Sequence, residues 1–232
     1  RLMIFNSPSN PTGMVYTHDE IAALVKVLER HPQVIIISDE IYEHIIFSGK
    51  HVSLASFESI RDRVVTANGV SKAYAMTGWR IGFIGAPLWI AKACIKLQGQ
   101  FTSGVSSISQ RAALAALTSK SDSRERMRDA FLRRRNLICD LLSGIEGLKV
   151  SKPEGAFYVM PDITSFFGKR CDGTVINNSD DMAMFLLDHA RVAVVGGNAF
   201  GSPECMRISY ATSDEKIKEA IRRIGEALAK LH

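Results

Sequence analysis

Residues 34–42 read Val-Ile-Ile-Ile-Ser-Asp-Glu-Ile-Tyr, and this stretch decides the fold. Four consecutive apolar residues, all β-branched, fit a strand that is buried on both faces. The side chains of Asp39 and Tyr42 follow directly after the apolar run ends. Ligands of open α/β sheets bind beyond the carboxyl ends of the strands, so a binding site is expected at these two residues.

Similar short apolar segments lie before and after this stretch. We predict further strands at residues 2–5, 64–68 and 81–85, and the central strand at 34–38. A helix is predicted to begin at Thr17, because Glu20 completes a capping box three residues later. Strands that alternate with helices predict an α/β fold with a mainly parallel sheet covered on both faces.

The rest of the chain is first helical and then mixed. Helices are predicted at 88–98, 108–117, 123–142 and 180–190, with a last helix capped by Thr212 and Glu215. Strands are predicted near 148–150, 157–160, 192–195 and 206–211. We therefore expect a partial large α/β domain at residues 1–122, a linking helix at 123–144 and a small α+β domain at 145–232.

Composition excludes several classes of function. No apolar run approaches the roughly 20 residues needed to cross a bilayer, so no membrane span is expected. The net charge of +5 is modest. The basic triplet Arg133–Arg135 lies in a helical pattern, which predicts a solvated helix face and does not require a nucleic-acid partner.

The cysteines and histidines indicate neither a disulfide framework nor a metal site. The four cysteines lie far apart without Cys-x-x-Cys spacing, and the six histidines form no ligand pattern. Reduced thiols in a cytoplasmic protein are the expected state. The chain begins with Arg1 rather than methionine and enters directly into an apolar run, so we expect the natural N-terminus to be absent.

Polar residues follow three of the predicted strands. Asn10-Pro11-Thr12-Gly13 comes after the first strand, Asp39 to Tyr42 after the second, and Ser71-Lys72 with Arg80 after the third. Taken singly, these are typical of a turn, a helix cap, a surface lysine and a surface ion-pair partner. The ordered set is more specific, because it brings an amide, a carboxylate, a phenol and an amine to one edge of a sheet.

This ordered set resembles class I aminotransferases of the aspartate aminotransferase superfamily, which are pyridoxal-phosphate enzymes of fold type I. Four segments carry the resemblance: residues 10–13, 39–42, 71–82 and 206–211. The resemblance extends over the whole chain and implies that it is the C-terminal portion of the usual family chain. It also implies the cofactor pyridoxal 5′-phosphate.

The resemblance implies a role for each matching residue at the cofactor ring. Lys72 would form the Schiff base with the cofactor and then move the substrate proton, which requires a primary amine. Asp39 would pair with the pyridine nitrogen and keep it protonated, so that the ring can accept electrons. Tyr42 and Asn10 would hydrogen-bond the ring oxygen.

The same resemblance implies roles at the phosphate and the substrate. Ser71 and Arg80 would hold the cofactor phosphate. Arg207 would bind the α-carboxylate of the substrate through its planar fork of donors, with Asn10 also at the substrate site.

The implied reaction transfers an amino group between an amino acid, with aspartate favoured, and a 2-oxo acid. A homodimer in the cytoplasm is the implied form. Family members carry a further N-terminal portion with a phosphate-binding loop. We therefore expect these residues alone to bind the cofactor poorly and to turn over slowly.

Two alternatives stay open. A pyridoxal-phosphate β-lyase would use the same residues, since removal of the α-proton is common to both reactions. A transcription regulator with an aminotransferase-like effector domain would carry a DNA-binding helix-turn-helix on preceding residues. Product analysis separates the first alternative, and the upstream sequence separates the second.

Overall fold

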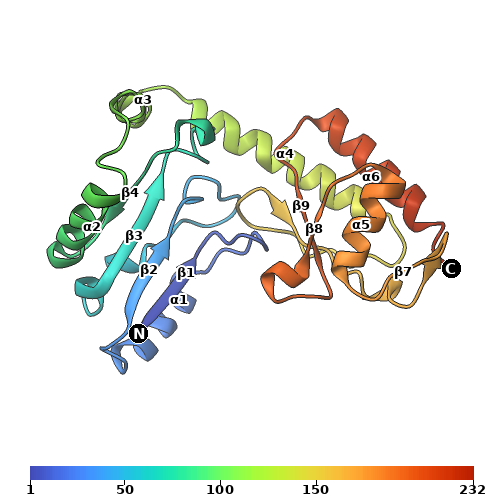
Figure 1. The fold of residues 1–232 in the computed structure, drawn as a ribbon, viewed down its shortest axis with the longest axis horizontal. Coiled ribbons are helices and arrows are strands. Elements are labelled where there is room, and N and C mark those ends of the chain that lie inside the picture. The colour runs from blue at the N-terminus through green and yellow to red at the C-terminus, as the bar shows by residue number, and fades with distance from the viewer. The chain divides into compact units, whose positions relative to one another are not determined.

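The computed structural model describes residues 1–232, which form two compact units. The first contains residues 1–9 and 14–128, and the second contains residues 10–13 and 129–232. The division falls within one helix, α4 (Ser123–Ser143), so this helix contributes to both units. The structure is an α/β protein, as the strand and helix pattern predicts (Figure 1).

The first unit is built on a four-stranded sheet in the order β1-β2-β3-β4. Strands β1 (Leu2–Asn6), β2 (Ile35–Asp39) and β3 (Val64–Gly69) are parallel. Strand β4 (Gly82–Gly85) runs antiparallel to β3 and forms an edge. The sheet is therefore mainly parallel, and the carboxyl ends of its three parallel strands meet at one edge (Figure 1).

Helix α1 (His18–Glu29) covers one face of this sheet. Its N-cap Thr17 and Glu20 form the predicted capping box. Ile21, on the apolar face of α1, is fully buried against sheet residues that include Phe5 and Ile36. Helical spacing of the apolar residues thus accounts for how α1 is held to the sheet.

The opposite face of the sheet is only partly covered within this chain, whereas the strand pattern predicts two covered faces. Ile4 is 70% exposed, and every residue of β4 is exposed. Helices α2 (Leu88–Phe101) and α3 (Ser107–Thr118) form as predicted, but α2 buries none of its residues. Apolar side chains are exposed on β1, β4, α2 and α3: Leu2, Ile4, Phe83, Ile84, Leu88, Trp89, Ile95, Leu97, Phe101, Ile108, Leu114 and Leu117.

The second unit is a small α+β arrangement. A three-stranded sheet has the order β5-β9-β8, made of β5 (Tyr158–Val159), β8 (Val195–Gly196) and β9 (Met206–Ser209). Helices α5 (Ser179–Ala190) and α6 (Asp214–Leu228) pack on each other. The predicted strand at residues 148–150 is wrong, because only an isolated bridge between Lys149 and Asp162 forms there.

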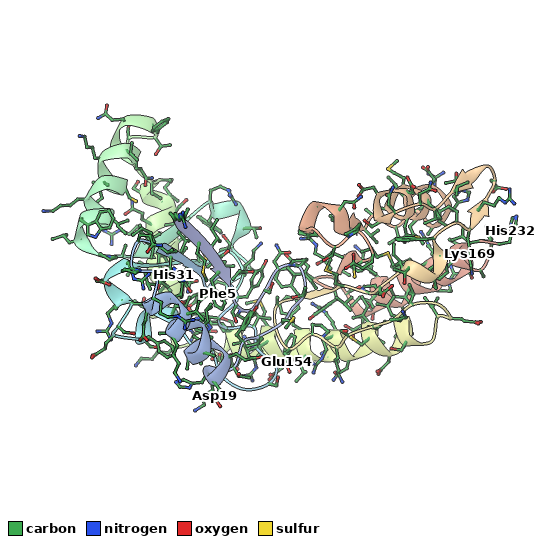
Figure 2. All side chains as sticks on the ribbon, turned by 90° about the horizontal axis from the view of Figure 1, so that it is seen from below. Phe5, Asp19, His31, Glu154, Lys169 and His232 are labelled. Atoms are coloured by element: carbon green, nitrogen blue, oxygen red, sulfur yellow. The ribbon has the colours of Figure 1, made fainter.

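Short elements complete the fold. A two-stranded ribbon is made of β6 (Arg170–Cys171) and β7 (Thr174–Val175). Arg170 also pairs through its backbone with the terminal residue His232, which lies near Lys169 in Figure 2. Five 3-10 helices occur: η1 (Leu54–Ser56), η2 (Arg61–Arg63), η3 (Thr77–Trp79), η4 (Thr164–Phe166) and η5 (Gly197–Phe200).

One local prediction is wrong, because Ser213 and not Thr212 caps α6: its hydroxyl accepts the hydrogen bond from Lys216 N. In the arginine triplet of α4, Arg133 is exposed as predicted. It also donates to both carboxylate oxygens of Asp214 at 3.0 and 3.3 Å. Arg135 donates to the carbonyl of Pro153 at 2.8 Å. These contacts hold α4 to the start of α6 and to the loop before β5.

All four cysteines are free, and burial raises the pKa of the Cys139 and Cys205 thiols. No helix has both the length and the apolar character that a membrane crossing requires.

Candidate active site

Asp39 is the last residue of β2, at the carboxyl edge of the sheet. Asn6, its partner in the register of β1, donates from Nδ2 to the Asp39 carbonyl at 2.9 Å. The Asp39 carboxylate accepts a hydrogen bond from Ile41 N at 3.2 Å through Oδ1. This turn fixes the direction of the carboxylate just beyond the strand, so the residue has a local structural role in addition to any chemical one.

Tyr42 and Lys72 meet beyond the same edge. Tyr42 lies three residues after β2 and is 3% exposed. Lys72 lies three residues after β3, and its Nζ is 5.9 Å from the centroid of the Tyr42 ring. Adjacent parallel strands therefore bring an amine to a phenol ring, while Asp39 ends the strand that leads to Tyr42.

Ser71 and Arg80 follow in the same segment. Ser71 is half-buried beside Lys72, whereas Arg80 is exposed. Arg80 adopts a left-handed backbone with φ of 52°, and its Nη1 donates to the carbonyl of Thr77 at 2.8 Å. This conformation at the end of η3 turns the chain into β4.

Asn10 and Arg207 belong to the second unit and are joined there. Arg207, on β9, donates from Nη1 to Asn10 Oδ1 at 2.8 Å. Its guanidinium carbon lies 4.6 Å from the Tyr158 ring centroid and 4.9 Å from that of Phe200. Two aromatic faces against a guanidinium give favourable cation–π contacts and restrict the plane of the fork.

The sequence-predicted residues thus fall into two groups. Asp39, Tyr42, Ser71, Lys72 and Arg80 follow β2 and β3 in the first unit. In the second unit, Asn10 and Arg207 are in direct contact.

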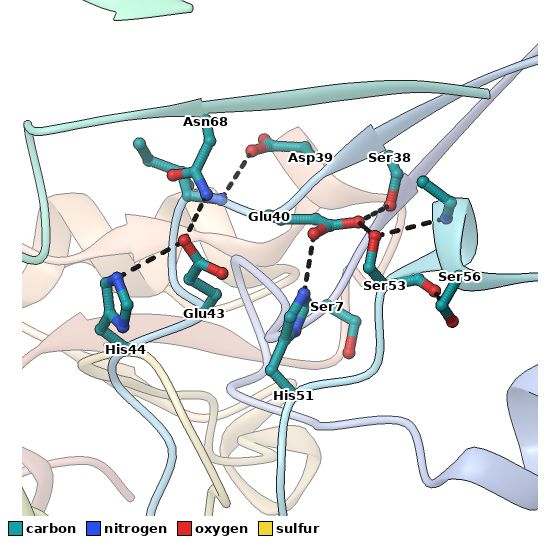
Figure 3. Close-up of polar contacts among 12 residues, drawn as sticks. Ser7, Ser38, Asp39, Glu40, Glu43, His44, His51, Ser53, Ser56 and Asn68 are labelled. Carbon is teal, nitrogen blue, oxygen red and sulfur yellow. Dashed lines mark hydrogen bonds and ion pairs between the residues drawn. The ribbon is translucent and has the colours of Figure 1, made fainter. Parts of the chain in front are cut away.

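A polar network that sequence reasoning missed surrounds Glu40 (Figure 3). The Glu40 carboxylate accepts hydrogen bonds from Ser38 Oγ at 2.8 Å and Ser53 Oγ at 2.7 Å. His51 Nε2 lies 2.8 Å from the other carboxylate oxygen. Ser38 and Glu40 flank the predicted site residue Asp39 in sequence, but nothing in the spacing of His51 and Ser53 indicates their contact with Glu40.

The residues beyond β2 and β3 suit pyridoxal 5′-phosphate chemically. Lys72 offers the primary amine that an aldehyde requires, and Asp39 offers a carboxylate for a pyridine nitrogen. The buried Tyr42 ring beside the amine offers a hydroxyl for a phenolic oxygen. The donor set therefore fits the cofactor that the sequence resemblance implies.

Comparison with known proteins agrees with this fit. A family model described as aminotransferase class I and II matches residues 1–224. The chain is 48% identical to a bifunctional aspartate aminotransferase and glutamate/aspartate-prephenate aminotransferase of Petunia hybrida, over 100% of this chain and 49% of that protein. It is 49% identical to an aspartate/prephenate aminotransferase of Cereibacter sphaeroides, over 98% of this chain and 58% of that protein.

Solved structures show the same relationship. The crystal structure of the aspartate aminotransferase from Rhizobium meliloti superposes with a TM-score of 0.96 at 44% identity, covering 100% of this chain and 59% of that one. The chain spans about half the length of the curated relatives it matches. The family match over nearly all residues, together with this fold, shows that the chain belongs to the class I and II aminotransferases.

Proposed function

We propose that the protein is a pyridoxal-phosphate-dependent aminotransferase that moves an amino group between an amino acid and a 2-oxo acid, with aspartate as the favoured donor. The relatives named above are aspartate aminotransferases, which supports both the reaction and the donor. The observation that carries the proposal is the Lys72 amine 5.9 Å from the Tyr42 ring, beyond the strand that Asp39 ends.

Lys72 has two roles in this proposal. Its Nζ binds the cofactor aldehyde covalently, which an arginine or an alkyl side chain cannot do. When substrate occupies the site, the free Nζ would take the proton from the substrate Cα and deliver it to C4′, the former aldehyde carbon of the cofactor. The bound cofactor supplies an electron sink for the carbanion left by that proton.

Asp39 and Tyr42 set the electrostatics around that amine. Asp39 holds the proton on the pyridine nitrogen, because a carboxylate in hydrogen-bond contact favours the protonated form. Its hydrogen bond from Ile41 N keeps one oxygen fixed while the carboxylate performs this role. The Tyr42 hydroxyl donates to the ring oxygen.

The remaining residues bind the charged ends. Ser71 and Arg80 hold the phosphate group, with Arg80 turning from Thr77 toward the anion. Arg207 binds the α-carboxylate of the substrate as a pair of parallel hydrogen bonds. Asn10, whose Oδ1 accepts a hydrogen bond from Arg207, would serve both the cofactor and the substrate.

The proposal extends to the organisation of the protein. Residues 1–122 form part of a large cofactor-binding domain, residues 123–144 a linking helix, and residues 145–232 a small domain. We propose a cytoplasmic homodimer, with an amino acid and a 2-oxo acid as its substrates and neither nucleic acid nor membrane as a partner.

Replacing Lys72 tests the function directly. In the full-length protein, Lys72→Arg should abolish the absorbance band of the lysine-bound cofactor and all detectable transamination from aspartate. Lys26→Arg is the matched control, because Lys26 is an exposed lysine on α1. Normal transamination by Lys72→Arg would refute the assignment.

Prephenate is a second candidate acceptor, because two of the named relatives are aspartate/prephenate aminotransferases. Amino-group transfer from aspartate to prephenate and to 2-oxoglutarate, measured in parallel, separates the two acceptors. A β-lyase is tested separately, with no acceptor present, because it would release the β-substituent of its amino-acid substrate together with ammonia and a 2-oxo acid.

A further inference from the structure

A buried carboxylate lies next in sequence to the proposed pyridine partner. Glu40 is 3% exposed, yet three side chains hydrogen-bond to its two oxygens. Since a carboxylate accepts at both oxygens, His51 donates from Nε2, which fixes its tautomer. Burying an ionised group is unfavourable unless it is fully hydrogen-bonded. The hydrogen bonds from Ser38, His51 and Ser53 therefore compensate for the burial of the Glu40 carboxylate.

The backbone of Glu40 ties the same residue to the neighbouring strand. Its N–H donates to the carbonyl of Ala67 on β3 at 2.9 Å, which continues the parallel ladder one step beyond Asp39. The carbonyl of Glu40 accepts from Glu43 N at 2.9 Å, closing the turn that contains Tyr42. Glu40 therefore connects the positions of Asp39 and Tyr42 to the strand that leads to Lys72.

The side chain extends this connection to a distant part of the loop. Ser53 caps η1, since its hydroxyl oxygen accepts from Ala55 N at 3.3 Å while donating to Glu40. Leu54, the next residue, is fully buried in the sheet core. Figure 3 shows the Glu40 carboxylate turned toward Ser53 and His51. The Glu40 carboxylate thus joins the beginning of the loop at residues 39–53 to its end at Ser53.

We propose that Glu40 is a positioning residue, which holds Asp39 and Tyr42 in place by anchoring the 39–53 loop to the core through Ser53 and His51. This inference rests on the proposed function, because Asp39 and Tyr42 are the residues it positions. Ligand atoms of Glu40, Glu43 and His51 lie within 4.8 Å of one another. We assign them to positioning rather than to ion binding, because protein donors already occupy both oxygens of Glu40.

Two substitutions at Glu40 separate anchoring from charge. Glu40→Ala removes every acceptor in the network. Glu40→Gln keeps an acceptor oxygen for Ser38 and Ser53, and its amide can donate to His51 in the other tautomer. We expect Glu40→Ala to lower kcat by about tenfold or more and to shift the pH midpoint of the cofactor absorbance by about half a unit or more. Glu40→Gln should stay within about threefold of the unsubstituted protein.

A serine pair supplies a milder test with an internal control. Ser53→Ala removes one donor to Glu40, whereas Ser56→Ala changes an exposed serine of the same 3-10 helix that donates only to the Ser53 carbonyl. Ser53→Ala should move both readouts in the direction of Glu40→Ala, and Ser56→Ala should leave both unchanged. This pair keeps the proposal testable if Glu40→Ala does not fold.

Hydrogen exchange on the cofactor-free protein gives a readout that needs no activity. Faster exchange confined to residues 39–53 in Glu40→Ala and Ser53→Ala supports the anchor. Unchanged exchange there, or an unchanged absorbance midpoint and kcat in Glu40→Ala, would overturn it. If the full-length protein forms no lysine-bound cofactor band, the proposed function fails, while hydrogen exchange still reports on the anchor.

Discussion

Arg207 and Asn10 are joined by a 2.8 Å hydrogen bond from Nη1 to Oδ1, although 197 residues separate them in the chain. The Arg207 fork also lies between the rings of Tyr158 and Phe200. Its Nε is buried and has no hydrogen-bond partner. An arginine held by an amide and two aromatic faces is oriented before any carboxylate arrives, which lowers the entropy lost on binding.

Arg207→Lys should therefore impair substrate binding, although it keeps the charge. A lysine ammonium cannot present two parallel donors or stack as a plane between two rings. We expect the KM for aspartate to rise by about a hundredfold, measured by steady-state transamination. Arg170→Lys, at an exposed position of β6, is the control and should behave as the unsubstituted protein. A normal KM in Arg207→Lys would argue against a carboxylate ligand at this position.

Asp39→Asn should reduce turnover more than stability. The amide keeps an oxygen to accept from Ile41 N, so the turn after β2 is preserved. The negative charge that favours the protonated pyridine nitrogen is lost, and we expect kcat to fall by on the order of a hundredfold. Turnover and thermal melting should be measured together, with Asp62→Asn, at an exposed residue of η2, as control. A fall in melting temperature large enough to account for the lower turnover would indicate a purely structural aspartate.

Local patterns predicted most of the secondary structure. The apolar runs at β1, β2 and β3 and the capping box at Thr17 depend on residues close together in sequence, and all are present. The strand predicted at residues 148–150 does not form, because only Lys149 has a backbone bridge partner, Asp162. Arg133 is exposed, as predicted, but its contact with Asp214, 81 residues later, could not be predicted from local spacing.

In the candidate site too, local sequence patterns predict some features and miss others. Strand ends located Asp39, Tyr42 and Lys72, because parallel strands place their carboxyl ends together. The contact of Glu40 with Ser53 depends on how a loop folds back on the strand, which periodicity does not encode. The chemical roles assigned to the site residues stay predictions until the substitutions are measured.

Gly13 should tolerate a side chain less well than Gly49. Both have positive φ, 70° and 71°, so an alanine is strained at either position. A Cβ on Gly13 would meet the Pro153 Cβ and the carbonyl of Gly155, whereas a Cβ on Gly49 meets nothing within 4 Å. Gly13→Ala should therefore lower the free energy of unfolding by about 1–3 kcal/mol more than Gly49→Ala, measured by urea denaturation. Equal effects would show that backbone strain alone matters.

Acid should remove the contribution of Glu40 to stability. Burial raises the pKa of this carboxyl, but hydrogen bonds from His51, Ser53 and Ser38 outweigh that effect, and the net pKa lies below its ordinary value of 4.5. A group whose pKa is lower in the folded state stabilises the protein above its unfolded-state pKa, and this contribution is lost as the pH falls through the folded-state pKa.

Glu40→Gln isolates this contribution, because the other carboxyls titrate alike in both proteins and their effects cancel in the difference. Below about pH 4.5 the difference in free energy of unfolding between the unsubstituted protein and Glu40→Gln should move in the direction of lower stability for the unsubstituted protein. Urea titrations at several pH values measure it, with Glu58→Gln as an exposed control. A difference that does not change with pH would mean that the Glu40 carboxyl has the same pKa in the folded and unfolded states.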